Sequence, residues 1–418
     1  MNNKKGNVLA IGIMFFLFAM ISFVTGLQNP MGIIAKAQFG ATNLMSQLGN
    51  AANFIAYAFL GLPAGFLLKG KGYKFTALVA VSVGFVGVGI SYLSGVLESF
   101  PVYLLGAFVS GFSMCMLNTV VNPMLNTLGG GGNKGNQLIQ LGGSINSLSA
   151  TIVPVLAGYL IGEVTANTQV ADVNPALFTA MGIFALAFVI IFFSQIPEPE
   201  LEAAAAAGEQ KKEGTLESIK GALAHKNLVF GVIAIFLYVG IEVGIPNVAN
   251  LYMTSPDGLG MATAVAGSLV GAYWFLMLVG RLVGSAVGAK VSSKTMMVAV
   301  SSVAIVFILL GIFLPKGLTI ALLDTQVPVA ILFFILCGLC TSVMWGAIFN
   351  LAVEGLGKYT SIASGLFMVM VCGGGILPLV QGAAADAAGY INSYWVLVVA
   401  LVYMLWFALF GSKMTKKA

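Results

Sequence analysis

The stretch IPEPELEAAAAAGEQKKEGTLESIKGALAHK, Ile196–Lys226, is the one long polar interruption in an otherwise apolar chain. Its alanine run is typical of a linker, and its second half, TLESIKGALAHK, predicts a short amphipathic helix at a membrane interface. Six hydrophobic segments precede the stretch and six follow it. We therefore predict an N-terminal six-helix bundle at 1–195, a cytoplasmic linker at 196–226 and a C-terminal six-helix bundle at 227–418.

The composition is that of a membrane protein. Of the 418 residues, 59% are hydrophobic and 8% are charged, and the mean hydropathy is +0.99. A soluble domain carries about a quarter charged residues. The first apolar run continues past about twenty residues without a small-residue cleavage site, so it predicts a membrane span and not a removed signal peptide. The 52 glycines suit helices that pack closely in lipid.

Segments that are long and apolar enough to cross a bilayer recur along the whole chain. We predict an all-α membrane protein with twelve spans at 8–33, 44–68, 75–95, 101–127, 137–162, 175–195, 227–252, 262–288, 294–314, 328–352, 361–384 and 391–411. Two bundles of six spans joined by a cytoplasmic linker are typical of the major facilitator architecture, with the halves related by a pseudo-twofold axis.

The basic residues predict the orientation. With both termini inside, the cytoplasmic side collects nearly all of the 19 Lys and Arg, whereas Lys36 and Lys316 lie outside and Arg281 lies within a span. The net charge of +5 therefore reflects topology, and we expect the lipid bilayer as a partner and no nucleic acid. The spacing of Cys337 and Cys340 lacks the soluble context of a metal or redox site, so we expect no metal.

Ionisable residues at membrane depth are functional candidates, because burying a charge in lipid is costly. Glu242 lies in the middle of the seventh span. It could bind a proton, a sodium ion or a sugar hydroxyl, or it could be a structural partner of Arg281. Arg281 could hold Glu242 or a gating carboxylate, or reach the cytoplasmic surface. Glu354 and Asp386 lie near the ends of spans ten and eleven, where a gating or structural role is expected.

Prolines mark two spans as discontinuous helices. Pro246 would free a backbone carbonyl and break the seventh span, which places Asn247 on the broken segment. Pro30 follows Gln28 and Asn29 in TGLQNPMG, which predicts another broken helix in the first span.

Uncharged polar residues predict a cavity for a neutral sugar. Carboxamides pair well with hydroxyls, because each group both donates and accepts hydrogen bonds. Aromatic rings suit the C–H faces of a pyranose. For any single amide, bonding between helices is an equal alternative. The candidate substrate-binding residues are Gln28, Asn29, Asn118, Asn122, Gln140, Asn146, Tyr238, Asn247, Trp274, Trp345 and Asn350.

Five segments resemble the fucose:proton symporter family of the major facilitator superfamily, which includes glucose/galactose transporters. GLPAGFLLKGKGYK (61–74) is similar to its loop after the second span, and NTVVNP (118–123) to its ETAANP. YVGIEVGI (238–245) is similar to its seventh helix, and GR (280–281) to its eighth. The stretch from Ile348 to Gly389 is similar to its helices ten and eleven. The resemblance implies substrate contact by Asn146.

One departure from the family affects ion coupling. The resembled symporters carry a carboxylate in helix one and a glutamate where this chain has Asn118, whether natural or introduced. An amide cannot titrate, so Asn118 cannot carry the proton. Glu242 could take over proton coupling, a sodium ion could bind oxygen ligands including Glu242, or transport could be uncoupled.

We therefore predict a monomeric transporter in a bacterial inner membrane that imports a neutral hexose such as glucose, galactose, fructose or fucose by alternating access. We expect no cofactor apart from a co-transported Na⁺ or H⁺. An exporter of another small metabolite and a sugar sensor without transport are the alternatives. No paired acid/base motif favours an enzyme.

Overall fold

The structure is a computed structural model of the chain. It describes residues 2–39, 43–161, 169–198, 201–202, 215–254, 258–261, 263–315, 317–322 and 325–413. The contacts divide the chain into two compact units. Unit 1 consists of Met1–Leu128, Ile145–Ala222 and Leu356–Val369, and unit 2 of Gly129–Ser144, Leu223–Gly355 and Met370–Ala418. Each unit thus contains one short segment from the opposite side of the linker.

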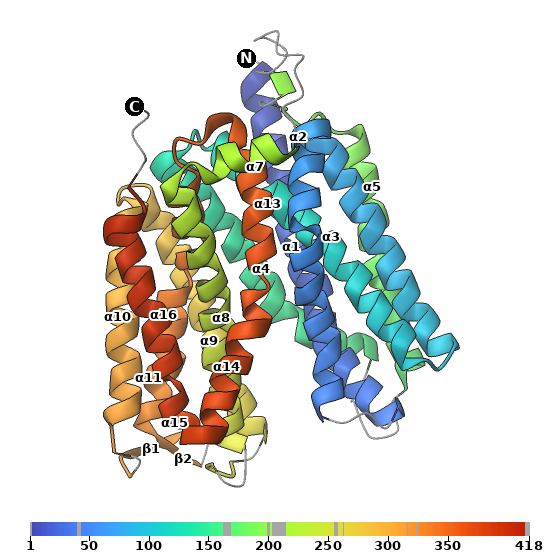
Figure 1. The fold of residues 1–418 in the computed structure, drawn as a ribbon. Coiled ribbons are helices and arrows are strands. Elements are labelled where there is room, and N and C mark those ends of the chain that lie inside the picture. Colours follow the sequence, from blue (N-terminus) through green and yellow to red (C-terminus); the bar gives the residue numbers. More distant parts are fainter. Residues whose placement is uncertain are drawn as a thin grey trace. The chain divides into compact units, whose positions relative to one another are not determined.

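Unit 1 is built from long helices that lie side by side (Figure 1). Its elements are α1 (Asn2–Phe39), α2 (Asn43–Val96), α3 (Phe100–Leu128), a 3₁₀ turn at Val170–Val173, α5 (Asn174–Phe193), α7 (Thr215–Leu223), a 3₁₀ turn at Gly357–Tyr359 and α13 (Thr360–Met370). The helix α4 (Gly132–Ile161) begins in unit 2 and continues into unit 1 at Ile145.

Unit 2 holds most of the elements that follow the linker. These are α8 (Lys226–Thr254), α9 (Thr263–Gly288), α10 (Ser293–Phe313), α11 (Val329–Thr341), α12 (Met344–Val353), α14 (Gly373–Ala388), α15 (Tyr390–Ser393), α16 (Trp395–Trp406) and a π-helical turn at Phe407–Gly411. A short antiparallel hairpin, β1 (Thr319–Leu322) and β2 (Thr325–Pro328), joins α10 to α11. This hairpin was not expected from the sequence.

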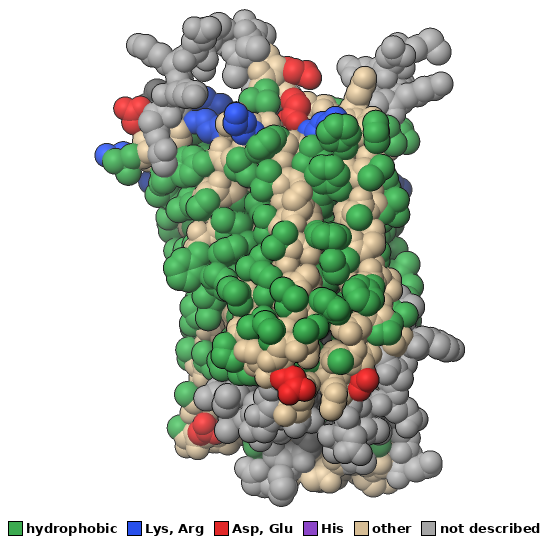
Figure 2. All heavy atoms as spheres, turned by 90° about the vertical axis from the view of Figure 1, so that its right-hand side faces the viewer, with side chains coloured by type: hydrophobic (Ala, Val, Ile, Leu, Met, Phe, Trp, Pro, Cys, Tyr) green, Lys and Arg blue, Asp and Glu red, His purple; other side chains and the backbone are tan. Residues whose placement is uncertain are grey.

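The predicted helical membrane fold is confirmed. Ten helices in the described part are long and apolar enough to cross a membrane. One of them, Ala51–Val96, covers two predicted spans, and α4 corresponds to the predicted span 137–162. On the face shown in Figure 2, hydrophobic side chains cover the middle of the molecule, and charged side chains gather toward its ends. This distribution is the one that a bilayer requires.

Gly72 separates the two spans within α2. Its φ of +82° lies in the left-handed region that glycine adopts without a steric penalty. The Glu198 carboxylate accepts hydrogen bonds from the backbone N–H groups of Tyr73 (2.7 Å) and Lys74 (2.8 Å), which begin the second helical segment. The Lys74 ammonium in turn donates to the Ser194 carbonyl at 2.8 Å, just beyond the end of α5. Each of the two helix ends therefore receives a side chain of the favourable charge.

The predicted helix breaks at prolines are wrong. The helix α8 continues through Pro246, and α1 continues through position 30. A proline removes a single backbone hydrogen bond, and a transmembrane helix tolerates this loss when a neighbouring group binds the freed carbonyl. Spans ten and eleven are interrupted instead, at Ser342–Val343 between α11 and α12 and at Val371–Cys372 between α13 and α14.

Candidate functional site

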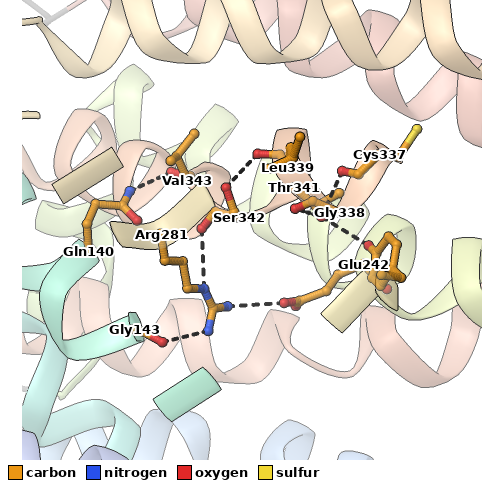
Figure 3. A network of polar contacts seen from close by, with 11 residues as sticks. Gln140, Gly143, Glu242, Arg281, Cys337, Gly338, Leu339, Thr341, Ser342 and Val343 are labelled. Atoms are coloured by element: carbon orange, nitrogen blue, oxygen red, sulfur yellow. Dashed lines mark hydrogen bonds and ion pairs between the residues drawn. The ribbon is translucent and has the colours of Figure 1, made fainter. Parts of the chain in front are cut away.

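Glu242 on α8 and Arg281 on α9 form an ion pair inside unit 2 (Figure 3). The Arg281 Nη2 lies 3.3 Å from the Glu242 Oε1, and their side chains are 11% and 15% exposed. Two opposite charges compensate for each other only in part when they leave water, and removing one partner of such a pair leaves an uncompensated charge. Pairing with Arg281, one of the alternatives open to Glu242, is present in this structure; binding of a proton, a sodium ion or a sugar hydroxyl stays a prediction.

Pro246 contributes to this site through the carbonyl that it leaves free. In a regular helix the N–H of residue 246 would donate to the Glu242 carbonyl, but proline has no N–H. The Tyr273 hydroxyl on α9 donates to this carbonyl at 3.2 Å and also lies 3.0 Å from the Thr341 hydroxyl on α11. Tyr273 therefore replaces the missing helix bond and joins α8 to α9 and α11.

The break between α11 and α12 presents backbone carbonyls to α9 and α4. Arg281 Nε donates to the Ser342 carbonyl at 3.3 Å, and Gln140 Nε2 on α4 donates to the Val343 carbonyl at 2.7 Å. Arg281 Nη1 also donates to the Gly143 carbonyl of α4 at 2.9 Å. One guanidinium thus contacts three separate segments, which its fork of donors makes feasible.

A series of aromatic side chains begins at the ion pair in unit 2. The fully buried Tyr238 hydroxyl faces both Glu242 and Arg281. The Tyr238 ring lies 6.2 Å from the ring of Trp345 between centroids, and Trp274 packs edge-on against Tyr273 at 5.3 Å. Trp274 is 38% exposed. Tyr238 therefore lies next to the charged pair, and Trp345 lies next to Tyr238.

The remaining candidates in unit 2 lie on α8, α12 and α14. Asn247 is exposed on α8. Asn350 Nδ2 donates to the Ser293 hydroxyl at 2.8 Å, at the start of α10. Glu354 is the exposed C-cap residue of α12, and Asp386 is exposed near the end of α14. The expected helix-end positions of Glu354 and Asp386 are therefore confirmed, whereas their gating or structural role stays a prediction.

Unit 1 contains the amides of α3 and the part of α4 from Ile145 onward. Asn118 Nδ2 lies 3.1 Å from both the Tyr57 hydroxyl of α2 and the Met114 carbonyl. Asn122, which is fully buried, donates to the Asn118 carbonyl at 2.9 Å. Asn146 donates to the Phe18 carbonyl of α1 at 3.0 Å. Substrate contact by these amides stays a prediction, and the side chains of Gln28 and Asn29 lie outside the described part of the chain.

A second proline-freed carbonyl lies in unit 1. Pro123 cannot donate to the Thr119 carbonyl, which instead accepts a hydrogen bond from the Ser364 hydroxyl of α13 at 3.1 Å. Glycines bring α13 close to α2, because a Cβ atom added to Gly365 would lie 2.6 Å from the Gly61 carbonyl oxygen and 2.9 Å from the Gly65 Cα. A side chain larger than hydrogen does not fit at this crossing.

Sequence reasoning missed the residues that connect the site to its neighbours. Tyr273, Thr341, Ser342 and Val343 lie among apolar residues, and none of the four is a proline or carries a charge. One signal was available, because the Glu242 carbonyl lies four residues before Pro246 and needs a donor from another helix. Nothing in the sequence identifies the helix that supplies it.

Comparison with known proteins places the chain in a family. Residues 12–378 match the model of the Major Facilitator Superfamily. The chain is 29% identical to a glucose/galactose transporter of Brucella abortus, over 99% of this chain and 96% of that protein. It is 22% identical to the L-fucose-proton symporter of Escherichia coli, over 90% of this chain and 86% of that one.

The fold agrees with these similarities. A crystal structure of the major facilitator transporter FucP in the outward conformation superposes with a TM-score of 0.82 at 19% identity, covering 98% of this chain and all of the other. The resemblance to the fucose:proton symporter family is confirmed by these relatives. The chain is a multi-pass membrane protein that belongs to the Major Facilitator Superfamily.

Proposed function

We propose that the protein imports a neutral monosaccharide, a hexose such as glucose, galactose, fructose or fucose, by alternating access. The name of the Brucella abortus relative supports a hexose substrate. The polar side chains within the described spans support an uncharged one, because most are amides and hydroxyls and the single arginine of the chain is already paired with Glu242. A bacterial inner membrane, cytoplasmic termini and a monomeric state complete the proposal.

Coupling to an ion gradient is assigned to Glu242. The observation that carries this assignment is its position: a carboxylate at membrane depth, 15% exposed, beside Arg281. Asn118 stands where the resembled symporters have a glutamate, and its amide bonds to the Tyr57 hydroxyl without a titratable group of its own. Either a proton or a sodium ion could neutralise the Glu242 carboxylate.

Uptake of labelled hexoses into proteoliposomes tests the proposal when proton and sodium gradients are imposed separately. We expect hexose accumulation driven by one of the two gradients. The coupled-sugar function is wrong if no hexose competes for uptake and neither gradient changes it. Uptake that competes but ignores both gradients would instead support uncoupled facilitation, which the pairing of Glu242 with Arg281 also permits.

The variant Glu242→Gln separates coupling from binding. We expect it to abolish gradient-driven accumulation and to retain counterflow exchange, since a neutral side chain cannot carry the charge-dependent step. Glu98→Gln is the matched control, because Glu98 is an exposed residue in the turn between α2 and α3. Unchanged accumulation by Glu242→Gln would remove Glu242 from the coupling role.

A further inference from the structure

The inner part of α4, Gly132–Ser144, belongs to unit 2, although the helix continues into unit 1. Four described contacts attach this segment within unit 2. Arg281 donates to the Gly143 carbonyl and Gln140 to the Val343 carbonyl. Ser285 Oγ lies 3.4 Å from the Gln137 carbonyl, and Asn136 Nδ2 lies 3.7 Å from the Met296 sulfur. Only the Arg281 contact involves a charged donor, and charge-assisted hydrogen bonds are the stronger kind.

We propose that Arg281 is a positioning residue that transmits the charge of Glu242 to the inner part of α4. While Glu242 is ionised, the ion pair holds the guanidinium where it also binds the Gly143 carbonyl, and α4 stays attached to unit 2. Neutralisation of Glu242, by a proton or by a monovalent cation, releases Arg281 and with it this attachment. The inference rests on the proposed coupling role of Glu242.

The direction of the effect follows from charge balance. With Glu242 ionised, the pair is neutral as a whole and 11–15% exposed. With Glu242 neutral, the guanidinium loses the charge of its carboxylate partner, while the carbonyls of Gly143 and Ser342 offer it uncharged oxygen acceptors. A buried charge that loses the charge of its ion-pair partner is less stable in a membrane. Conformations in which Arg281 reaches water are then favoured, and these require it to leave α4.

The other titratable groups that face Glu242 do not change this balance. They are Tyr238 on α8, Tyr273 on α9 and, next to Tyr273, Cys337 on α11. Phenols and thiols ionise at much higher pH than carboxylates. On the α14 side of α8, Leu377 and Gln381 pack against Gly240 and Gly244, and neither titrates. In the described part of the chain, Arg281 is therefore the cation that responds to the state of Glu242.

The acceptor on α4 is the backbone carbonyl of Gly143, so the contact with Arg281 depends on the position of the helix. Arg281 binds the Gly143 carbonyl whatever side chain residue 143 carries, but only when this turn of α4 lies against α9. A Cβ atom added to Gly143 would lie 3.4 Å from the Arg281 Cδ, which is an ordinary contact. The contact therefore depends on the attachment of α4 and does not depend on the identity of residue 143.

Disulfide formation between α4 and α9 measures this attachment directly. A Cβ atom at Gly288 would lie 3.8 Å from the Gln137 Cα, so the pair Gln137→Cys and Gly288→Cys is close to the separation that a disulfide needs. The pair lies away from Glu242 along α9. The four native cysteines are changed to serine in every variant. The rate of oxidative cross-linking in proteoliposomes is compared between the Glu242 and Glu242→Gln backgrounds at each pH, so that the pH dependence of thiol chemistry cancels.

We expect cross-linking at pH 8 without sodium to be about five-fold or more slower with Glu242→Gln, the lower end of typical coupling between sites. Acid should bring the Glu242 background to the same slow rate if the proton is the ligand. Sodium, but not potassium, should do so at pH 8 if sodium is the ligand. Equal rates in the two backgrounds under every condition would overturn the inference.

The double variant Glu242→Gln with Arg281→Gln tests whether charge is the cause. This variant lacks both charges of the pair, so we expect faster cross-linking than with Glu242→Gln alone. Acid and sodium should then have no effect on its rate, apart from the effect of pH on the reactivity of the thiols. A rate as slow as that of the single variant would mean that loss of contacts, and not charge, detaches α4, and would refute the proposed role of Arg281. Hexose counterflow, measured on the same samples, reports the proposed function separately from this conformational result.

Discussion

Tyr273→Phe should destabilise the protein in a way that depends on Pro246. The Tyr273 hydroxyl occupies the Glu242 carbonyl at 3.2 Å and contacts the Thr341 hydroxyl at 3.0 Å. Without the hydroxyl, the carbonyl has neither its helix donor nor its substitute, and an unsatisfied buried group costs about 1–3 kcal/mol. The Thr341 contact adds about 0.6 kcal/mol, the average for hydrogen bonds between membrane helices. We therefore expect a loss of about 2 kcal/mol.

The same substitution should cost less in a Pro246→Ala background. Alanine supplies an N–H that bonds to the Glu242 carbonyl, because α8 is helical on both sides of this position. Only the Thr341 contact is then lost, about 0.6 kcal/mol. The double-mutant cycle should therefore show a coupling of about 1–2 kcal/mol between Tyr273 and Pro246. Thermal unfolding of the purified protein in detergent, followed by tryptophan fluorescence, measures the four Tm values.

Tyr394→Phe is the matched control for this cycle. The Tyr394 hydroxyl donates to the Ile245 carbonyl at 2.8 Å, and residue 249 is an alanine whose N–H can occupy that carbonyl. Its effect should be small and equal with and without Pro246. If Tyr273→Phe lowers the Tm by the same amount in both backgrounds, the carbonyl freed by proline does not explain the role of Tyr273.

Three further predictions concern unit 1. Gly365→Ala should lower the Tm by several degrees, because its Cβ would lie 2.6 Å from the Gly61 carbonyl oxygen, whereas Gly382→Ala, with nothing within 4 Å, should leave it unchanged. Burial raises the pKa of Glu198 despite the opposing hydrogen bonds from Lys74 and Tyr73. The stability that this shift contributes is therefore complete below the ordinary glutamate pKa of about 4.3 and is lost as the pH rises through the raised pKa of Glu198. Between about pH 4 and 7, the Tm of wild type should therefore fall relative to the Tm of Glu198→Gln. A Tm difference that does not change with pH would contradict the shift. Asn118→Glu should change the pH profile of hexose accumulation, since it places a titratable group beside the Tyr57 hydroxyl. A pH profile in proteoliposomes identical to that of wild type would count against this.

The spans of the fold could be predicted because a bilayer imposes a length and a polarity on every helix that crosses it. The short loop at 69–74 also marked the turn at Gly72, since lysines and glycines interrupt the apolar pattern there. The interruptions at Ser342–Val343 and Val371–Cys372 could not be predicted in the same way. Both lie in apolar runs. At the first, Arg281 and Gln140 from elsewhere in the chain bind the exposed carbonyls, and at the second the N–H groups of Gly374, Gly375 and Ile376 do so locally.

The candidate site was predictable in its charges and less so in its contacts. Glu242 and Arg281 stand out because ionisable residues are rare at membrane depth, and their pairing was one of the alternatives that the sequence left open. Gln140 and Asn146 lie on one predicted span, yet they bond into different units. Contacts between residues more than a hundred positions apart decide which turn of α4 belongs to which unit. Local sequence patterns do not predict such contacts.

The hydrogen bond from Ser364 to the Thr119 carbonyl has a consequence for the evolution of this chain. The acceptor is available because residue 123 is proline, so the two positions, 241 residues apart, share one constraint. A lineage that replaces Pro123 regains the local N–H and no longer selects for a hydroxyl at position 364. A lineage that keeps the proline can exchange serine for threonine there but not for alanine without loss. Substitutions at these two positions should therefore be correlated among homologues, and an alignment in which they vary independently would show that the bond is dispensable.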